Sequence, residues 1–496
     1  MEILYKSTRS NSQPVTASQA ILQGLSEDGG LFVPTAIPKL DVTIEQLMEM
    51  SYQEVAYEVM SRFLTDFTED ELKHCINSAY DEKFDTKAIA PIAAKNGEYY
   101  LELFHGATIA FKDMALSILP HLMTTAAKKN NAKNDIVILT ATSGDTGKAA
   151  MAGFADVPGT KIIVFYPKNG VSTIQELQMV TQKGENTYVV AINGNFDDAQ
   201  SAVKRMFNDK ELEKELADAG YQFSSANSIN IGRLVPQIAY YVYAYAQMCK
   251  MGEIKPGDEI NVDVPTGNFG NILAAFYAKN MGMPIAKLIC ASNDNKVLYD
   301  FFRTGEYDRK RDFILTTSPS MDILISSNLE RLIYRIAGND ADRNSAFMES
   351  LAKEGKYEIT DDMKAQLADF YGNYATEQEG ADKIAKVYKE TGYVMDTHTA
   401  VAAAVYDKYV AETGDSRKTV IASTASPYKF ARSVMSAIAP EYAELEDFAL
   451  IDKLSELAKV AEPNAIKEIR NAEIRHNTVV DVDKMQDAVK NILGIK

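Results

Sequence analysis

The feature that most limits the possible folds of this 496-residue chain is a regular alternation of short apolar runs and helix-like stretches. The first series, from Asp135 onward, has apolar runs at 136–140, 161–166 and 187–192, with helical periodicity at 148–155, 174–181 and 197–207. The second has apolar runs at 259–264, 287–291 and 419–423, with helical periodicity at 234–250, 272–281 and 399–410. Strands that alternate with helices are typical of parallel sheets covered by helices. The sequence therefore predicts an α/β protein with two twisted, mostly parallel sheet domains.

The remaining stretches suggest how the domains are divided. Residues 1–95 form a predicted N-terminal domain, with helical spacing from about 44 to 79, and residues 96–134 are assigned to the larger sheet domain as the segment that carries Lys112. Residues 135–225 are assigned to a smaller α/β domain and residues 226–440 to the larger one. Two stretches are predicted to be helical. These are a charged insertion at about 305–395, with helices at 322–337 and 361–374, and a C-terminal tail at 441–496.

Composition excludes several classes of partner. The formal net charge of −17 argues against nucleic-acid binding, which needs clustered Lys and Arg, although a local cationic pocket could still bind a small anion. The three cysteines, Cys75, Cys249 and Cys290, lack metal-ligand spacing and are interpreted as reduced thiols of a cytoplasmic protein without a metal site. Neither a signal peptide nor a run long enough to span a membrane is recognised. The oligomeric state is left open.

Lys112 is the most informative single residue, because it lies in the apolar and small-residue segment Phe104-His-Gly-Ala-Thr-Ile-Ala-Phe-Lys-Asp113. Burying an unpaired ammonium costs several kcal/mol, on the order of the penalty for other buried ions. A lysine in an apolar pocket has a lowered pKa and forms Schiff bases with aldehydes such as pyridoxal phosphate. The alternative is an ordinary lysine whose stem lies along the surface with its ammonium in water.

Three polar loops follow predicted strands, where ligands bind in open α/β sheets. They are Thr140-Ala-Thr-Ser-Gly-Asp-Thr-Gly147, Val264-Pro-Thr-Gly-Asn-Phe-Gly-Asn271 and Ala422-Ser-Thr-Ala-Ser-Pro-Tyr-Lys429. The first two also precede helices, whose free N–H groups favour anions. The first loop has the look of a Walker A motif at Gly144 to Lys148, but it lacks the glycine spacing and the final Ser or Thr. Each loop taken alone is also compatible with a plain turn.

A fourth polar element, Ser224-Ser-Ala-Asn-Ser-Ile-Asn-Ile-Gly-Arg233, ends on an arginine at a helix start. A guanidinium binds phosphate through two hydrogen bonds, which an ammonium does less well. Arg233 is therefore a candidate phosphate ligand, and a solvated surface arginine is the alternative.

Together these motifs resemble the threonine synthase family, whose members are pyridoxal-phosphate enzymes of the tryptophan-synthase-like, fold type II group. The lysine segment, the loops at 142–147 and 265–270, the element at 225–233 and the N-terminal Asp28-Gly-Gly-Leu-Phe-Val-Pro34 are similar to family patterns in order and separation. Three positions depart from common patterns. Asp145 stands where many members of the wider group have Asn, and Ala107 and Ser426 replace a Pro and a His that are common in threonine synthases.

The resemblance implies a role for each matching residue. Lys112 would bind the cofactor covalently, and Thr424 would face its pyridine nitrogen. Asp145 is a candidate contact of its O3′ atom. The cofactor phosphate would be held by Gly267, Asn268, Phe269, Gly270 and Asn271. The carboxylate and phosphate of the substrate would be held by Thr142, Ser143, Thr146, Asn227, Ser228 and Arg233.

The implied reaction converts O-phospho-L-homoserine and water into L-threonine and phosphate, by γ-elimination followed by β-addition. Lys112 would move the α- and β-protons, while Arg233 and a helix end stabilise the leaving phosphate. Whether that phosphate then acts as a base stays open. His105 is a rival base by position in the sequence, although a structural role is favoured.

Two other functions remain possible from sequence. One is another fold type II enzyme, such as a serine or threonine dehydratase, which would not need an arginine for a second phosphate. The other is a non-enzymatic anion- or nucleotide-binding protein, which would not need Lys112.

Overall fold

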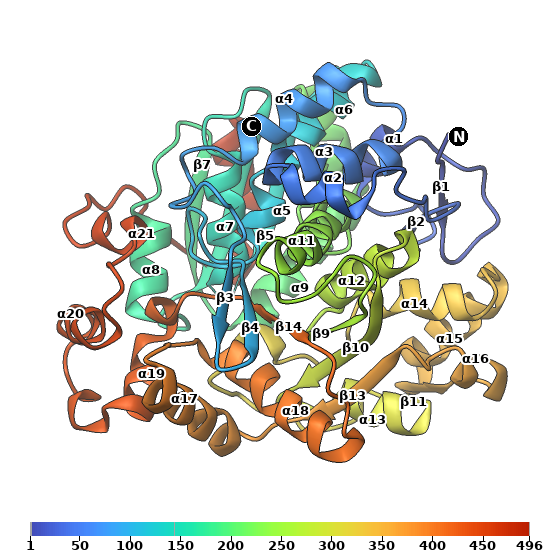
Figure 1. Cartoon of the computed structure of the whole chain (residues 1–496). Coiled ribbons are helices and arrows are strands. Elements are labelled where there is room, and N and C mark those ends of the chain that lie inside the picture. Colours follow the sequence, from blue (N-terminus) through green and yellow to red (C-terminus); the bar gives the residue numbers. More distant parts are fainter. Residues whose placement is uncertain (1, 143, 496) are drawn as a thin grey trace.

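The computed structural model describes residues 2–142 and 144–495 and contains two main sheets (Figure 1). The larger sheet has the order β13-β10-β9-β14-β4-β3, and all its neighbours are parallel except the β3–β4 pair. Its strands are β3 (Ile92–Lys95), β4 (Glu98–Glu102), β9 (Ile260–Pro265), β10 (Ile285–Ser292), β13 (Phe370–Tyr374) and β14 (Thr419–Ser423). The expected α/β fold is therefore confirmed.

The smaller sheet has the order β15-β7-β6-β5-β8 and is parallel throughout. Its strands are β5 (Asp135–Ala141), β6 (Thr160–Pro167), β7 (Thr187–Asn193), β8 (Tyr221–Ser224) and β15 (Thr478–Asp481). The central strands are almost entirely buried, which explains why they are visible in the sequence as continuous apolar runs.

Helices cover both sheets. The helices that carry or flank the site are α5 (Asp113–Leu116), α6 (Leu119–Lys129), α7 (Asp145–Phe154), α8 (Thr173–Val180), α11 (Ile231–Lys250), α12 (Gly270–Met281), α14 (Leu329–Ile336) and α18 (Thr397–Thr413). Helix α11 is buried on nearly all sides, as expected for a helix that is packed within the core of a large protein. No helix in the described part of the chain is long and apolar enough to cross a membrane.

The N-terminal region contributes α2 (Ile44–Glu49) and α3 (Tyr52–Phe63), which lie beside α11, and α4 (Glu69–Ala79), which packs on α3 and α6 (Figure 1). Each begins with a capping box, in which a Thr or Ser and the residue three positions later satisfy each other's backbone N–H groups. Their apolar faces belong to the same buried cluster as α11 and α12, so this region shares a core with those helices.

The predicted helix at 361–374 is wrong in its second half, where Phe370–Tyr374 forms β13 and pairs with β10. Aromatic residues favour strands, and a Cβ added to Gly372 would lie 2.8 Å from Phe302, so the strand fits closely onto its neighbour.

The predicted helix at 322–337 begins only at Leu329, as α14. Asp322 instead accepts hydrogen bonds from Thr316 and Asn293, which hold a non-helical turn.

The tail at 441–496 is not wholly helical either, because β15 adds a parallel strand to the edge of the smaller sheet beside β7. This pairing satisfies backbone groups of an edge strand that is distant in the sequence.

Asp263, in the middle of β9, is fully buried, and within the described part of the chain neither oxygen of its carboxyl group has a hydrogen-bond partner. Burial raises the pKa of Asp263 well above its ordinary value of 3.8, so the folded chain binds this proton more tightly than the unfolded chain does. The stability that Asp263 contributes is thus complete below its unfolded pKa and is lost as the pH rises toward its folded pKa, by up to about 1.4 kcal/mol per pH unit.

Asp263→Asn keeps the shape of the side chain but cannot titrate. We expect the Tm of this variant to fall less than that of the unmodified chain when the pH is raised from about 5 to about 8. The measurement is the Tm at both pH values by circular dichroism. Equal losses in the two proteins would contradict a neutral Asp263.

Candidate active site

Three neighbouring parallel strands bring three of the sequence motifs to one edge of the larger sheet. The segment with Lys112 follows β4, the loop with Thr424 follows β14, and the glycine-asparagine loop follows β9. The first two motifs also pair directly, since Phe111 N–H donates to the Thr424 carbonyl at 2.8 Å and Ala110 forms a bridge with Ala425. Ligands of open α/β sheets bind at this edge. The structure therefore places the predicted residues where a site is expected.

Lys112 lines a small cavity together with Phe111, Asp145, Ser320, His398 and Thr424. The burial of its amine lowers the pKa of Lys112, and the positive charges of Lys429 and Arg233 lower it further, against a raising effect of Asp145. A larger fraction of the amine is therefore neutral and nucleophilic than in an exposed lysine. The cavity volume of about 10 Å³ has room for about one water molecule, so its side chains must rearrange to admit a larger ligand.

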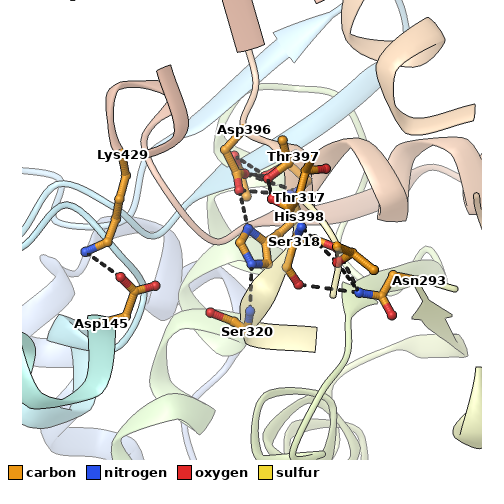
Figure 2. Close-up of polar contacts among 12 residues, drawn as sticks. Asp145, Asn293, Thr317, Ser318, Ser320, Asp396, Thr397, His398 and Lys429 are labelled. Carbon is orange, nitrogen blue, oxygen red and sulfur yellow. Dashed lines mark hydrogen bonds and ion pairs between the residues drawn. The ribbon is translucent and has the colours of Figure 1, made fainter. Parts of the chain in front are cut away.

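Asp145 is held at the edge of this cavity by an ion pair between the start of α7 and the loop that follows β14 (Figure 2). Its carboxylate lies 3.3 Å from the amine of Lys429 and accepts a hydrogen bond from Gln175 at 3.0 Å. Lys429 also donates to the Thr108 carbonyl, at 3.0 Å, in the segment that carries Lys112. Burial raises the pKa of Asp145, but Lys429 and Lys112 more than offset this and hold it below its ordinary value. Asp145 is therefore an anion, and its proposed contact with the cofactor stays a prediction.

The loop between β5 and α7 is organised by Thr142. Its hydroxyl accepts hydrogen bonds from the N–H groups of Gly144 and Gly147, both at 3.0 Å. Gly144 has a φ of 131°, and an added Cβ would lie 2.5 Å from Gln175, so only glycine fits there. Thr146 is partly exposed in the first turn of α7, whereas Ser143 lies outside the described residues.

Arg233 is a buried cation that has no counter-charge among the described residues. It lies in the first turn of α11 with 3% exposure, and burial lowers its pKa to about 10. One guanidinium nitrogen donates to the Ala226 carbonyl at 2.7 Å, but the Nε atom has no partner. Among the described residues, no carboxylate lies within ion-pair distance of it. An anion bound here would satisfy both the free donor and the charge.

Asn227 and Ser228, from the same sequence element, lie before α11, the first exposed and the second partly buried. Ser228 accepts a hydrogen bond of 3.5 Å from Asn328. Their predicted contacts with a substrate remain predictions.

The loop between β9 and α12 is shaped by two backbone features. Phe269 has a φ of 67°, which aims the chain into α12 while its ring is buried against Phe302 and Phe370. At Gly267 an added Cβ would lie 2.4 Å from the Ser320 carbonyl, so two loops can meet there only because the residue is glycine.

The start of α12 offers free donors to an anion. No side chain caps this helix, which leaves the first N–H groups from Gly270 onward available. Asn271 accepts hydrogen bonds from Tyr240, at 2.8 Å, and from Tyr241, so its side-chain N–H₂ group is buried without a partner. This loop is thus a second place, separate from Arg233, that favours an anion, as expected for a phosphate.

Three residues of the cavity region were not found from the sequence: Ser320, His398 and Asp396 (Figure 2). Asp396 caps α18, and an Asp before a predicted helix is a recognisable signal, but only of a helix start. Ser320 lies in a short turn, 208 residues from Lys112 in the sequence, and nothing local indicates its position.

Asn328, the N-cap of α14, and Arg331, in its first turn, hold two of the loops together. The Asn328 backbone N–H donates to the Asn268 carbonyl at 3.0 Å. Arg331, which is 1% exposed, donates to the Ile229 carbonyl at 2.6 Å and to the Phe32 carbonyl at 2.9 Å. The stretch predicted as a helical insertion therefore supports both anion-favouring places.

His105 lies between the carboxylates of Asp85 and Glu102, at 2.5 and 2.9 Å. Burial lowers the pKa of His105, but both carboxylates outweigh it and raise the pKa to about 9. A protonated, paired histidine is a poor base, which supports the structural role.

A larger cavity of about 470 Å³, near His74 and His121, contains none of the predicted site residues.

These observations test whether the residues fit a cofactor with an aldehyde and a phosphate group. Lys112 supplies an amine with a lowered pKa, and the unpartnered Asn271 N–H₂ group and the α12 terminus supply donors. Arg233, a buried guanidinium with a free donor, favours a second anion at a separate place. The donor set fits such a cofactor together with a substrate that carries its own phosphate.

Comparisons with known proteins cover nearly the whole chain. Residues 4–80 match the family model "Threonine synthase N terminus", residues 93–425 match "Pyridoxal-phosphate dependent enzyme" and residues 399–492 match "Threonine synthase, C-terminal". The threonine synthase of Schizosaccharomyces pombe is 36% identical over 88% of this chain and 90% of its own length. The human protein threonine synthase-like 1 is 41% identical over 85% of this chain, which spans only 58% of that relative's length.

A solved structure of pyridoxal-phosphate-bound threonine synthase from Brucella melitensis is also similar. It has a TM-score of 0.85 and 34% sequence identity, with 99% of each chain covered. The likeness extends over the N-terminal helices, both sheets and the C-terminal tail.

Proposed function

Because the chain belongs to the threonine synthase family of pyridoxal-phosphate-dependent enzymes, we propose that it converts O-phospho-L-homoserine and water into L-threonine and phosphate. The observation that carries this proposal is Arg233, a buried guanidinium with a free Nε donor and no carboxylate partner among the described residues. A phosphate on the substrate, in addition to that of the cofactor, accounts for it.

The residues that would hold the cofactor come from the three loops at the edge of the larger sheet. Lys112 would bind it covalently, and Thr424 would face the ring nitrogen as a neutral hydroxyl group. Its phosphate would lie at the start of α12 among Gly267, Asn268, Phe269, Gly270 and Asn271, with Asp145 on the side of the smaller domain. When bound, pyridoxal phosphate supplies an electron sink that stabilises negative charge at the substrate carbons next to the amine.

The chain's own residues would do the rest. The neutral amine of Lys112 would take the proton from Cα, deliver it to a neighbouring carbon of the conjugated system and, neutral again, take one from Cβ of the substrate; its lowered pKa favours both directions of transfer. Arg233 would bind the phosphate and stabilise the charge that develops as it leaves. The substrate carboxylate and phosphate would also contact Thr142, Ser143, Thr146, Asn227 and Ser228.

Phosphate release with three amino acids tests this proposal. We expect the purified protein, loaded with pyridoxal phosphate, to release phosphate and form threonine from O-phospho-L-homoserine, and to produce no threonine from L-homoserine or L-serine. Formation of an oxoacid from L-serine or L-threonine, with O-phospho-L-homoserine unused, would favour a dehydratase instead. A protein that binds no pyridoxal phosphate would contradict both enzymatic functions.

A small-molecule enzyme is also consistent with the net charge of −17, which disfavours nucleic-acid partners. All three cysteines are buried free thiols, which supports the cytoplasmic location expected from the sequence.

A further inference from the structure

We propose that Ser320 is a further catalytic residue, which binds the free amine of Lys112 and orients it, and that His398 and Asp396 are positioning residues for Ser320. The proposal rests on the proposed function only in that Lys112 is the amine that reacts. It assigns a task to the segment 316–322, which lies in the stretch predicted as a helical insertion.

The Lys112 amine donates a hydrogen bond to the Ser320 hydroxyl oxygen at 3.1 Å. No ion pair of Lys112 is present among the described residues, so this hydroxyl is its direct polar partner. A neutral amine that donates one N–H keeps its lone pair free, and the hydrogen bond fixes the direction in which that lone pair points. Ser320 therefore orients the amine without protonating it.

His398 fixes the backbone of Ser320 (Figure 2). The Ser320 backbone N–H donates to His398 Nε2 at 3.1 Å, so this nitrogen must be an acceptor. The proton of the neutral ring then lies on Nδ1, which is 2.7 Å from an Asp396 carboxylate oxygen. The histidine is thus held in one tautomer by contacts on both sides of its ring.

Asp396 is itself fixed by the start of α18. It is fully buried and accepts hydrogen bonds from the backbone N–H groups of His398, at 2.9 Å, and Thr399, at 3.1 Å, as well as from the Thr399 hydroxyl. An N-cap carboxylate is also favoured by the helix dipole. Through Asp396 and His398, the backbone of Ser320 is therefore anchored to the start of α18, a helix of 17 residues.

The two flanks of the Ser320 turn are anchored independently of His398. Thr397 donates to the Thr317 carbonyl at 2.7 Å, and Asn293 donates to Ser318, at 2.9 Å, and to Asp322, at 2.8 Å. On the far side the Ser320 carbonyl contacts Gly267, where a Cβ would approach to 2.4 Å. Because the backbone of the turn is held on all these sides, Ser320 stays next to Lys112, and its hydroxyl reaches the amine in the side-chain rotamer seen here.

The function of such a contact follows from when Lys112 is free. Its amine is free before the cofactor attaches, and again after a substrate amine has displaced it. In both situations an amine on a four-carbon stem would sample many orientations, and each ordered rotamer costs free energy. The hydrogen bond to Ser320 removes this disorder in advance, so attachment of the cofactor and proton transfer both become faster.

Reloading of the full-length protein with pyridoxal phosphate tests the proposal without any substrate. The cofactor is removed with hydroxylamine, pyridoxal phosphate is added, and attachment to Lys112 is followed by borohydride trapping and peptide mass spectrometry. We expect Ser320→Ala to attach the cofactor about tenfold more slowly, and Ser320→Thr, which keeps the hydroxyl, to stay within about threefold. A rate for Ser320→Ala within about twofold of the unmodified protein would overturn the proposal.

Two further comparisons separate orientation from loosening of the turn. Ser318→Ala removes another hydroxyl of the same turn, one that does not contact Lys112. Asn293 keeps Thr316 and Asp322 as hydrogen-bond partners in this variant. The Ser318→Ala protein should therefore attach the cofactor at the normal rate. His398→Leu should be slow, whereas His398→Gln, which restores an acceptor for the Ser320 N–H, should be faster. Equal slowing by Ser318→Ala, or equal rates for the two His398 variants, would count against the assigned roles.

The His398 pair keeps the test decisive if Ser320→Ala does not fold. If Ser320→Ala attaches the cofactor slowly, as expected, but the unmodified protein releases no phosphate from O-phospho-L-homoserine, the proposed function is refuted and the role of Ser320 remains. If Ser320→Ala attaches the cofactor at the normal rate and the unmodified protein does release phosphate, only the role of Ser320 is refuted.

Discussion

Lys112→Ala is expected to lower phosphate release from O-phospho-L-homoserine by at least about a thousandfold, because it removes both the covalent anchor of the cofactor and the group that moves the protons. The purified variant should also lose the absorbance of covalently bound pyridoxal phosphate. Borohydride should then no longer fix the cofactor to the chain. The measurements are the rate of phosphate release and the mass of the borohydride-treated protein.

Lys148 offers a matched control for this variant. Burial lowers the pKa of Lys148 to about 8, so it too has a perturbed amine, but that amine is hydrogen-bonded to Gln182 and does not line the Lys112 cavity. Lys148→Met should therefore keep the covalently bound cofactor and most of the activity. Attachment of the cofactor to Lys148, or its retention in Lys112→Ala, would contradict the assignment of Lys112.

Arg233→Ala is expected to lower kcat/KM for O-phospho-L-homoserine by about a hundredfold to a thousandfold, the cost of losing a charged group that stabilises a leaving anion. Attachment of pyridoxal phosphate should be nearly unchanged, because the cofactor phosphate is assigned to the start of α12. Arg233→Lys should recover part of the loss, since an ammonium keeps the charge but not the paired hydrogen bonds. Steady-state kinetics and reloading with the cofactor separate the two effects.

Arg331 is the matched control for this prediction. It is another buried arginine, and its pKa is also lowered by burial to about 10, but its nitrogens all donate to carbonyl groups or to Asn328. Arg331→Lys should therefore lower the Tm, whereas Arg233→Lys should lower it less, because Arg233 has a single hydrogen bond to lose, to the Ala226 carbonyl, and its Nε atom has none. Unchanged turnover in Arg233→Ala would remove the main argument for a phosphorylated substrate and restore the dehydratase alternative.

Most of the fold could be predicted because its strands are buried on both faces and carry local signals. The run predicted at 419–423 coincides with β14, and those at 136–140 and 161–166 lie within β5 and β6. Prediction failed where a short element depends on its neighbour. The segment Phe370–Tyr374 is a strand only because β10 and Phe302 are beside it, and β15 only because β7 offers a free edge.

The site shows the same division between local and long-range information. Lys112, Gly267, Thr424 and Arg233 could be singled out because each lies in a motif with its own pattern of small, polar and apolar residues. Ser320 and His398 carry no such pattern, and neither does Lys429 as a partner of Asp145. Their contacts join residues from different motifs, and no local pattern records such a pair.

By itself, the sequence determined which segments become strands, helices and polar loops, and it thereby determined the residue types available to the site. Only the tertiary structure decided that β9, β14 and β4 are neighbours, so that the three loops meet and the turn at 316–322 covers them. The physical reason is that periodicity and turn chemistry act over a few residues, whereas strand order is set by the packing of whole layers. Lys112 could be recognised in the sequence as an unusual lysine, but Ser320, whose hydroxyl accepts a hydrogen bond from its amine, could be identified only in the folded chain.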